Sequence, residues 1–326
     1  MTARLGPREK TLPAGEVARR LCASLCSVIR GKRPVIEHVV AGFLAGGHIL
    51  VDDVPGLGKT TLAKTIARSI GGAGRATSLS FKRIQFTPDL LPYDVTGVDV
   101  FEPASKRFVF SPGPVFCNVL LADEINRTTP KVQSALLEVM AERQVTVGNR
   151  THAVDEPFFV IATRNPVETE GTYALPLAEL DRFLMKLSLG YPDYDAELQI
   201  VREDPASRIM PTVRPICRKA ELIAAQRASG EVHCDERLLG VAVRVSEATR
   251  GHAGIEIGAS PRGTLMLVQA SRGLAVVRGR DFCIDQDLLE IAPVVLAHRL
   301  RMRDRRTDAA SLVRELVLEE LDKLGH

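Results

Sequence analysis

The chain has 326 residues, of which 45% are hydrophobic and 25% charged, a composition typical of a soluble globular protein with room for about two domains. A net charge of +3 is too small to indicate a nucleic-acid partner, and an aromatic content of 5% without tryptophan gives no support to a base-stacking surface. No apolar run approaches the roughly 20 residues that cross a bilayer, and the basic N-terminus lacks the apolar segment of a secretory signal, so a cytoplasmic protein is expected.

The first part of the chain alternates helical patterns with buried strands. After a loose tail at 1–14, the predicted elements in chain order are helices at 15–29 and 34–47, a strand at 48–53, a helix at 59–70, a hairpin at 98–116, a strand at 117–124, a helix at 128–143, a hairpin at 144–154 and a strand at 157–166. Helices that alternate with apolar strands indicate a parallel sheet covered on both faces.

Beyond about Pro192 the strand pattern disappears and helical stretches dominate. They are predicted at roughly 193–204, 217–228, 235–250, 261–278 and 285–303. We therefore expect an α/β domain over 15–191 that is followed by an all-α domain over 192–326.

The stretch VDDVPGLGKTT, residues 51–61, nearly matches the phosphate-loop pattern G-x-x-x-x-G-K-[ST]. In such a loop, backbone N–H groups and a helix N-terminus point at the phosphates. Lys59 would reach the β- and γ-phosphates, and the Thr60 hydroxyl would hold Mg²⁺. The residues expected to contact nucleotide here are Pro55, Gly56, Leu57, Gly58, Lys59, Thr60 and Thr61. The alternative is a strand–turn–helix with a solvated lysine.

One position departs from the pattern, because Asp53 stands where the first glycine belongs. A carboxylate ~5 Å from one phosphate charge costs roughly 3 kcal/mol at an effective dielectric near 20. The sequence therefore predicts a working but weakened nucleotide site, which Asp53→Gly would tighten.

A pair of carboxylates follows a second buried strand, in VLLADE. In a phosphate-loop enzyme the acid at this point, here Asp123, holds the Mg²⁺ shell, largely through water. The next carboxylate, Glu124, can polarise the attacking water as a general base. The alternative is two exposed acids at a strand end, which is common.

Three further polar residues are candidates for catalysis. Asn165 ends the strand in VIATRNP, at the edge where open α/β sheets bind ligands, and an amide there can position a water. The alternative is that Asn165 only turns the chain before Pro166. Arg182 and Arg262 are of the residue type that neutralises charge on a transferring phosphoryl group, although their spacing alone does not single them out.

Long stretches of the chain closely resemble the MoxR family of AAA+ ATPases, in the helix-2-insert clade. These stretches are VPGLGKT, RIQFTPDLLPYDVTG, LLADEINRTTPKVQSALLEVMAERQVTV, PFFVIATRNPVETEGTYALPLAELDRFLMKLSLGYP and GASPRGTLMLVQASRGLAVVRGRDF. The resemblance implies a phosphate-loop AAA+ parallel sheet with flanking helices, followed by an all-α lid domain. It also implies that the hairpin at 98–116 is the helix-2 insertion.

The resemblance implies a role for each motif residue. Lys59 and Thr60 would belong to Walker A, and Asp123 and Glu124 to Walker B. Asn165 would be sensor 1, Arg182 the finger that reaches a neighbouring subunit's nucleotide, and Arg262 sensor 2 of the lid. Gly31 would lie beside the adenine, and Val28 and Ile29 would line the base. The cofactors would be ATP and Mg²⁺.

Three functions remain open. The first is an ATP-hydrolysing, ring-forming remodeller of other proteins; for this the resemblance implies a homo-hexamer, a partner with a von Willebrand factor A domain and a client complex. The second is a nucleotide-gated scaffold with weak turnover because of Asp53. The third is a DNA-remodelling motor, but the hairpin tips are only mildly basic, and the cluster HRLRMRDRR at 298–306 is expected to be a solvated helix end or a subunit contact.

Overall fold

The computed structural model describes residues 12–323 except 72–78, 167–170 and 305, so most of the predicted tail at 1–14 lies outside the described residues. Its centre is a five-stranded parallel sheet in the order β2-β5-β8-β1-β9. The strands are β1 (Ile49–Asp52), β2 (Phe81–Gln85), β5 (Val119–Asp123), β8 (Phe159–Arg164) and β9 (Met185–Leu187). The predicted parallel α/β sheet is confirmed.

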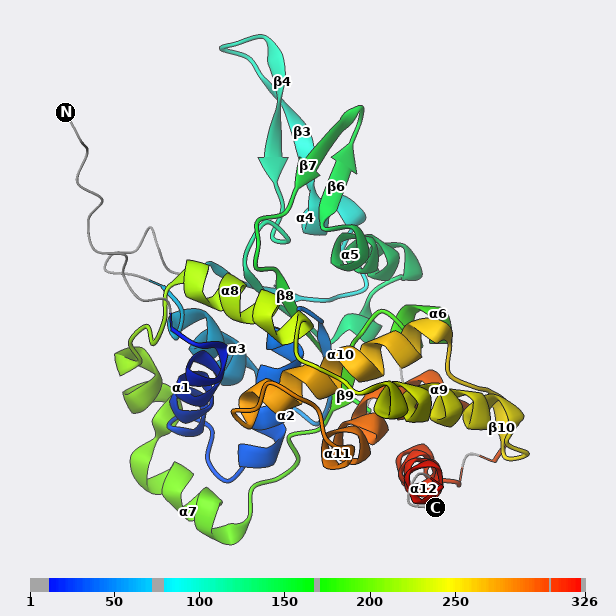
Figure 1. Ribbon diagram of the computed structural model, residues 1–326. Coiled ribbons are helices and arrows are strands. Elements are labelled where there is room, and N and C mark those ends of the chain that lie inside the picture. The colour runs from blue at the N-terminus through cyan, green and yellow to red at the C-terminus, as the bar shows by residue number, and fades with distance from the viewer. Residues whose placement is uncertain (1–11, 72–78, 167–170, 305, 324–326) are drawn as a thin grey trace, which may run out of the picture.

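Helices cover both faces of this sheet (Figure 1). Alternate strand residues point to opposite faces, so Leu121 and Ile161 pack into one apolar cluster while Leu120 and Val160 pack into the other. The first cluster also holds α1 (Ala14–Cys26), α2 (Arg33–Leu44) and α3 (Lys59–Arg68), and the second holds α4 (Pro92–Thr96) and α5 (Pro130–Glu142). Strands buried on both faces must be apolar along their buried length, as β5 is up to Ala122 and β8 up to Ala162.

The register of the sheet brings three strand ends together. Asp52 at the end of β1 lies opposite Arg164 at the end of β8, and Ala122 of β5 lies opposite Ala162 of β8. The residues that follow these strands therefore meet at one edge of the sheet, where open α/β sheets bind ligands.

Two antiparallel hairpins project side by side from the sheet domain (Figure 1). The first consists of β3 (Gly97–Glu102) and β4 (Arg107–Pro112), and the second of β6 (Gln144–Val147) and β7 (Arg150–Ala153). The ring of Phe110 in β4 stacks on His152 in β7 with centroids 3.8 Å apart. Both predicted hairpins are confirmed.

A short helix, α6 (Leu177–Leu180), precedes β9. Beyond β9 the described chain is mainly helical and forms the lid. Its helices are α7 (Tyr194–Glu203), α8 (Lys219–Gly230), α9 (Glu236–Gly251), α10 (Pro261–Val277), α11 (Asp285–Leu296) and α12 (Ala309–Asp322). Among the described residues, no helix is long and apolar enough to cross a membrane.

The predicted helical lid is confirmed, but two details of it differ from expectation. The lid contains a small antiparallel sheet, β10 (Ile255–Ile257) with β11 (Arg301–Met302), because three- and two-residue strands are too short to leave a periodic pattern. The helix expected at 285–303 ends at Leu296, and the basic cluster that follows it is not a solvated helix end throughout, since His298 and Arg299 are buried.

Candidate nucleotide-binding and hydrolysis site

The phosphate loop connects β1 to α3. Gly56 and Gly58 have φ of +89° and +85°, a left-handed backbone conformation that residues other than glycine rarely adopt. The helix begins at Lys59. The Lys59 ammonium donates hydrogen bonds to the carbonyl oxygens of Asp53 at 2.8 Å and Val54 at 3.1 Å. The loop therefore has the backbone turns, the helix N-terminus and the cation that an anion site requires.

The residues expected to form Walker A and Walker B line one cavity of about 340 Å³. Its lining residues are Pro55, Gly56, Gly58, Lys59, Thr60, Thr61, Arg83, Gln85, Asp123 and Glu124. Asp123 is held in place on two sides, since one carboxylate oxygen accepts from the Thr163 hydroxyl at 2.5 Å and the other from Arg83 at 2.6 Å.

Glu124 has a left-handed backbone, with φ of +57°, directly after β5. Its amide donates to the Thr163 hydroxyl at 2.9 Å, and its carboxylate accepts from Gln85 at 2.7 Å and Arg127 at 3.1 Å. Arg83 and Gln85 were not expected in the site. They lie in the stretch RIQFTPDLLPYDVTG, to which no catalytic role was assigned, and the pairing of β2 with β5 brings them to the carboxylates.

The donors in this cavity suit magnesium. Thr60 and Asp123 offer oxygen ligands, which Mg²⁺ prefers. Among the described residues, no group of three or more His, Cys, Asp and Glu side chains forms a cage for a metal. Magnesium typically keeps several waters and is bound by one or two carboxylates and the substrate phosphates, so such a cage is not required. When bound, the ion would neutralise charge on the phosphates.

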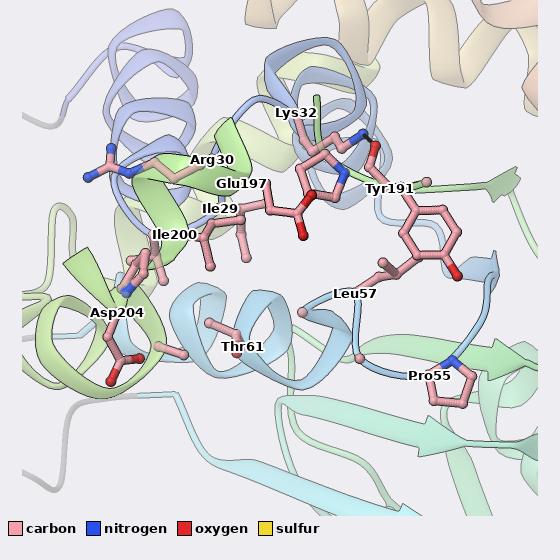
Figure 2. Close-up of a pocket in the computed structure, with 17 residues that line it drawn as sticks. Ile29, Arg30, Lys32, Pro55, Leu57, Thr61, Tyr191, Glu197, Ile200 and Asp204 are labelled. Atoms are coloured by element: carbon pink, nitrogen blue, oxygen red, sulfur yellow. Dashed lines mark hydrogen bonds between the residues drawn. The ribbon is translucent and has the colours of Figure 1, made fainter. Parts of the chain in front are cut away.

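A second cavity, of about 410 Å³, adjoins the first and shares the phosphate loop with it (Figure 2). Its lining residues are Val28, Ile29, Arg30, Lys32, Pro55, Gly56, Leu57, Gly58, Thr61, Gly190, Tyr191, Pro192, Glu197, Ile200, Asp204, Pro205 and Ala206. Val28 and Ile29 lie here as expected of base-lining residues. The wall formed by 190–206 was not anticipated, because motif reasoning locates the phosphates and leaves the far side of the base unassigned.

Gly31 does not line this cavity, contrary to expectation. It has φ of +69°, and a Cβ on it would lie 2.5 Å from the Cβ of Ala196 in α7. The absence of a side chain at Gly31 therefore allows α7 to approach the segment that carries Val28 and Ile29. Gly31 thus influences the shape of the cavity without lining it.

Asn165 directly follows β8, the strand between β5 and β1, and is 5% exposed. This position puts its backbone at the sheet edge between the end of β5 and the start of the phosphate loop. It is the arrangement expected of a residue that positions a water, and its role stays a prediction.

Arg182 and Arg262 line neither cavity. Arg182 donates to the carbonyl oxygen of Leu137 at 2.6 Å, and its neighbour Asp181 accepts from Ser260 at 3.1 Å and from Arg299 at 2.9 Å. Burial, and to a lesser extent the charge of Arg262, lowers the pKa of Arg299 to about 10 against the opposing effect of Asp181. Figure 1 shows α6 and the first turn of α10 next to each other, on the other side of the view from α3.

Asp53 does not face the phosphate loop's cavity, which overturns the basis of the predicted weakening. Its side chain is buried, with 5% of the residue exposed, and the residue is absent from the lining of both cavities. The carboxylate accepts hydrogen bonds from the Ser188 hydroxyl at 2.6 Å and the Leu189 amide at 2.6 Å. The repulsion between the Asp53 carboxylate and the phosphates is therefore smaller than the sequence predicted.

Comparison with known proteins agrees with this geometry. The profile of the ATPase family associated with various cellular activities (AAA) matches residues 48–185, and that of the AAA lid domain matches residues 247–316. The chain is 42% identical to the chaperone MoxR1 of Mycobacterium tuberculosis over 84% of this chain and 72% of that protein. The chain belongs to the MoxR family of AAA ATPases.

Two further comparisons extend over nearly the full length. The protein YeaC of Bacillus subtilis is 44% identical over 89% of this chain and 90% of its own. A crystal structure from Cytophaga hutchinsonii superposes with a TM-score of 0.85 at 35% identity, covering 94% of both chains. The sheet followed by a helical lid is therefore the shared architecture.

Proposed function

We propose that this MoxR-family protein binds ATP with Mg²⁺ and hydrolyses it. The observation that carries the proposal is that Lys59, Thr60, Asp123 and Glu124, which come from two distant parts of the chain, line one cavity. The adjoining apolar cavity between Ile29 and α7 has room for a base. Phosphoryl transfer requires mainly positioning and charge stabilisation, which these groups supply.

In the proposed reaction, a water oxygen attacks the γ-phosphorus as the bond to the bridging oxygen breaks and ADP leaves. Glu124 takes the proton of that water, and Asn165 holds the water in place. Lys59 and the loop amides stabilise the negative charge on the phosphates. Phosphate release from ATP, measured with unmodified protein and with Lys59→Ala as the inactive control, tests the proposal; equal release by both proteins would overturn it.

We further infer that the protein works as a homo-oligomeric ring, with six subunits as the resemblance implies. The support is that Arg182 and Arg262 line neither cavity of their own subunit. Both lie on one flank, since Arg182 directly follows Asp181, and Asp181 pairs with Arg299, whose pKa is affected by the charge of Arg262. An arginine on that flank acts on the nucleotide of the next subunit only in a heterologous, closed assembly. Light scattering with and without an ATP analogue tests the ring.

The proposed role is chaperone-like remodelling of partner proteins, including one with a von Willebrand factor A domain. A relative named a chaperone supports the role. The paired hairpins, with Phe101 and Phe108 exposed, offer an apolar surface for a client. A pull-down with Glu124→Gln protein held in ATP tests it; recovery of no protein beyond that of a nucleotide-free control would count against the role.

The two alternatives lose support. A weakly active scaffold was motivated by a carboxylate at the phosphates, and Asp53 faces elsewhere. A DNA motor needs a basic surface, yet Arg299 of the 298–306 cluster is buried in an ion pair with Asp181. The exposed Arg301 and Arg306 of this cluster are paired with Glu256 and Asp304, which reduces the net positive charge there. We expect no salt-sensitive retention of DNA in a filter-binding series.

A further inference from the structure

The carboxylate of Asp53 connects the phosphate loop to the segment that enters the lid. We call this segment, residues 188–192, the connector; it follows β9 and precedes α7. The Asp53 carboxylate accepts from the Ser188 hydroxyl at 2.6 Å, the Leu189 amide at 2.6 Å and the Gly190 amide at 3.2 Å. One buried carboxylate thus accepts hydrogen bonds from three consecutive residues of the connector.

The connector is also a wall of the larger cavity. Gly190, Tyr191 and Pro192 line it together with α7, as Figure 2 shows for the labelled residue Tyr191. Lys32, from the opposite wall, donates to the carbonyl oxygen of Tyr191 at 2.6 Å. A shift of the connector would therefore change the shape of the cavity.

The main chain of Asp53 contacts the phosphate-binding lysine at the same time. Its carbonyl oxygen accepts from Lys59 at 2.8 Å, and its amide donates to the carbonyl oxygen of Arg164 at 3.2 Å. Asp53 is therefore bonded to the phosphate loop through its backbone and to the connector through its side chain.

We propose that Asp53 is a positioning residue that couples occupation of the phosphate loop to the position of the connector and hence of α7. This inference rests on the proposed nucleotide site. A glycine at position 53 would fit the general loop pattern but leave the amides of Leu189 and Gly190 without their acceptor. The Leu189 amide lies in a residue only 3% exposed, and an unpaired buried amide is costly. The aspartate thus supports nucleotide binding, opposite to the expectation from the loop pattern.

The test combines calorimetric titration of a non-hydrolysable ATP analogue with hydrogen exchange of the connector amides. We expect Asp53→Gly to bind the analogue roughly tenfold more weakly, because the cavity wall must then be ordered on binding. The amides of residues 189 and 190 should exchange faster, and the slowing of their exchange by the analogue should be lost. Ser188→Ala removes one of the three donors and should produce smaller changes in the same direction.

Asp287→Asn serves as the matched control, since this buried lid carboxylate accepts from Arg280 and from the Ile284 amide and lines neither cavity. It should lower the melting temperature and leave analogue affinity and connector exchange unchanged.

Equal or tighter binding by Asp53→Gly, or unchanged connector exchange in that variant, would overturn the inference. If that variant fails to fold, unchanged exchange in Ser188→Ala overturns it instead. Absence of binding by the unmodified protein would overturn the proposed function, and the coupling with it.

Discussion

Glu124 is the residue on which turnover should depend most directly. Its carboxylate lines the same cavity as Lys59 and is oriented by Gln85 and Arg127. Glu124→Gln keeps the shape and removes the base, so we expect ATP binding to survive and turnover to fall by roughly 10²-fold or more. Phosphate release and analogue titration measure the two quantities.

The control for this prediction is Glu138→Gln, an exposed carboxylate on α5, which should leave turnover unchanged. Turnover in Glu124→Gln equal to that of the unmodified protein would rule out Glu124 as the base.

At the same scale, motif reasoning identified residues but not the directions of their side chains. It located Lys59, Asp123 and Glu124, which the structure brings to one cavity. It placed the Asp53 carboxylate near the phosphates, because a one-dimensional pattern carries no information on where a side chain points. The Asp53 carboxylate accepts hydrogen bonds from residues 135 to 137 positions away along the chain, and no local sequence pattern predicts these contacts.

At the scale of elements, the approach of α7 to the segment 28–32 forms the base cavity. Gly31→Ala would put a Cβ 2.5 Å from that of Ala196, at a residue with φ of +69°. We expect the helix to shift, analogue affinity to fall by about tenfold, and stability to fall by about 1–3 kcal/mol, the range for a strained backbone position. Calorimetric titration and urea unfolding measure the effects.

The matched control for Gly31→Ala is Gly230→Ala at the end of α8, where a Cβ meets nothing within 4 Å. Identical affinities for Gly31→Ala and the unmodified protein would contradict the role given to this glycine.

Sequence patterns recovered the buried strands, the hairpins and the longer helices, and missed the edge strands and the shortest elements. The buried strands β1, β5 and β8 and the longer helices leave clear apolar patterns. The edge strands β2 and β9, the four-residue helix α6 and the lid strands β10 and β11 are too short or too exposed to do so. Their assignment depends on pairing with distant segments, which a local pattern does not contain.

For the molecule as a whole, buried histidines predict a loss of stability in mild acid. His48 accepts from the Val160 amide at 3.0 Å, and burial lowers its pKa to about 3; burial also lowers the pKa of His298 well below its usual value. The unfolded chain takes up these protons near pH 6.5 and the folded chain does not, so stability is complete above about pH 6.5 and is lost as pH falls.

The two histidines together should cost about 2 kcal/mol of unfolding free energy between about pH 6.5 and 5.5, since each proton is worth about 1.4 kcal/mol per pH unit once the unfolded histidine is charged. Urea unfolding at several pH values measures the slope. His48→Gln should reduce it by about half, and the same slope in this variant would exclude His48 as a source.

The central claim is that this protein hydrolyses ATP at a site which a neighbouring subunit completes. Lys59 belongs to the loop cavity, and Arg182 lines neither cavity. Lys59→Ala and Arg182→Ala should each remove most of the activity, while Arg182→Ala should keep its affinity for an ATP analogue. The two variants therefore lack different halves of the proposed site.

The most direct measurement is steady-state ATP turnover of the two variants mixed in equal amounts, after both are shown to assemble. We predict recovery to about a quarter of the unmodified activity, because random assembly in a ring places an intact loop against an intact Arg182 at about one interface in four. A mixture of assembled variants that stays as inactive as each variant alone would contradict the account.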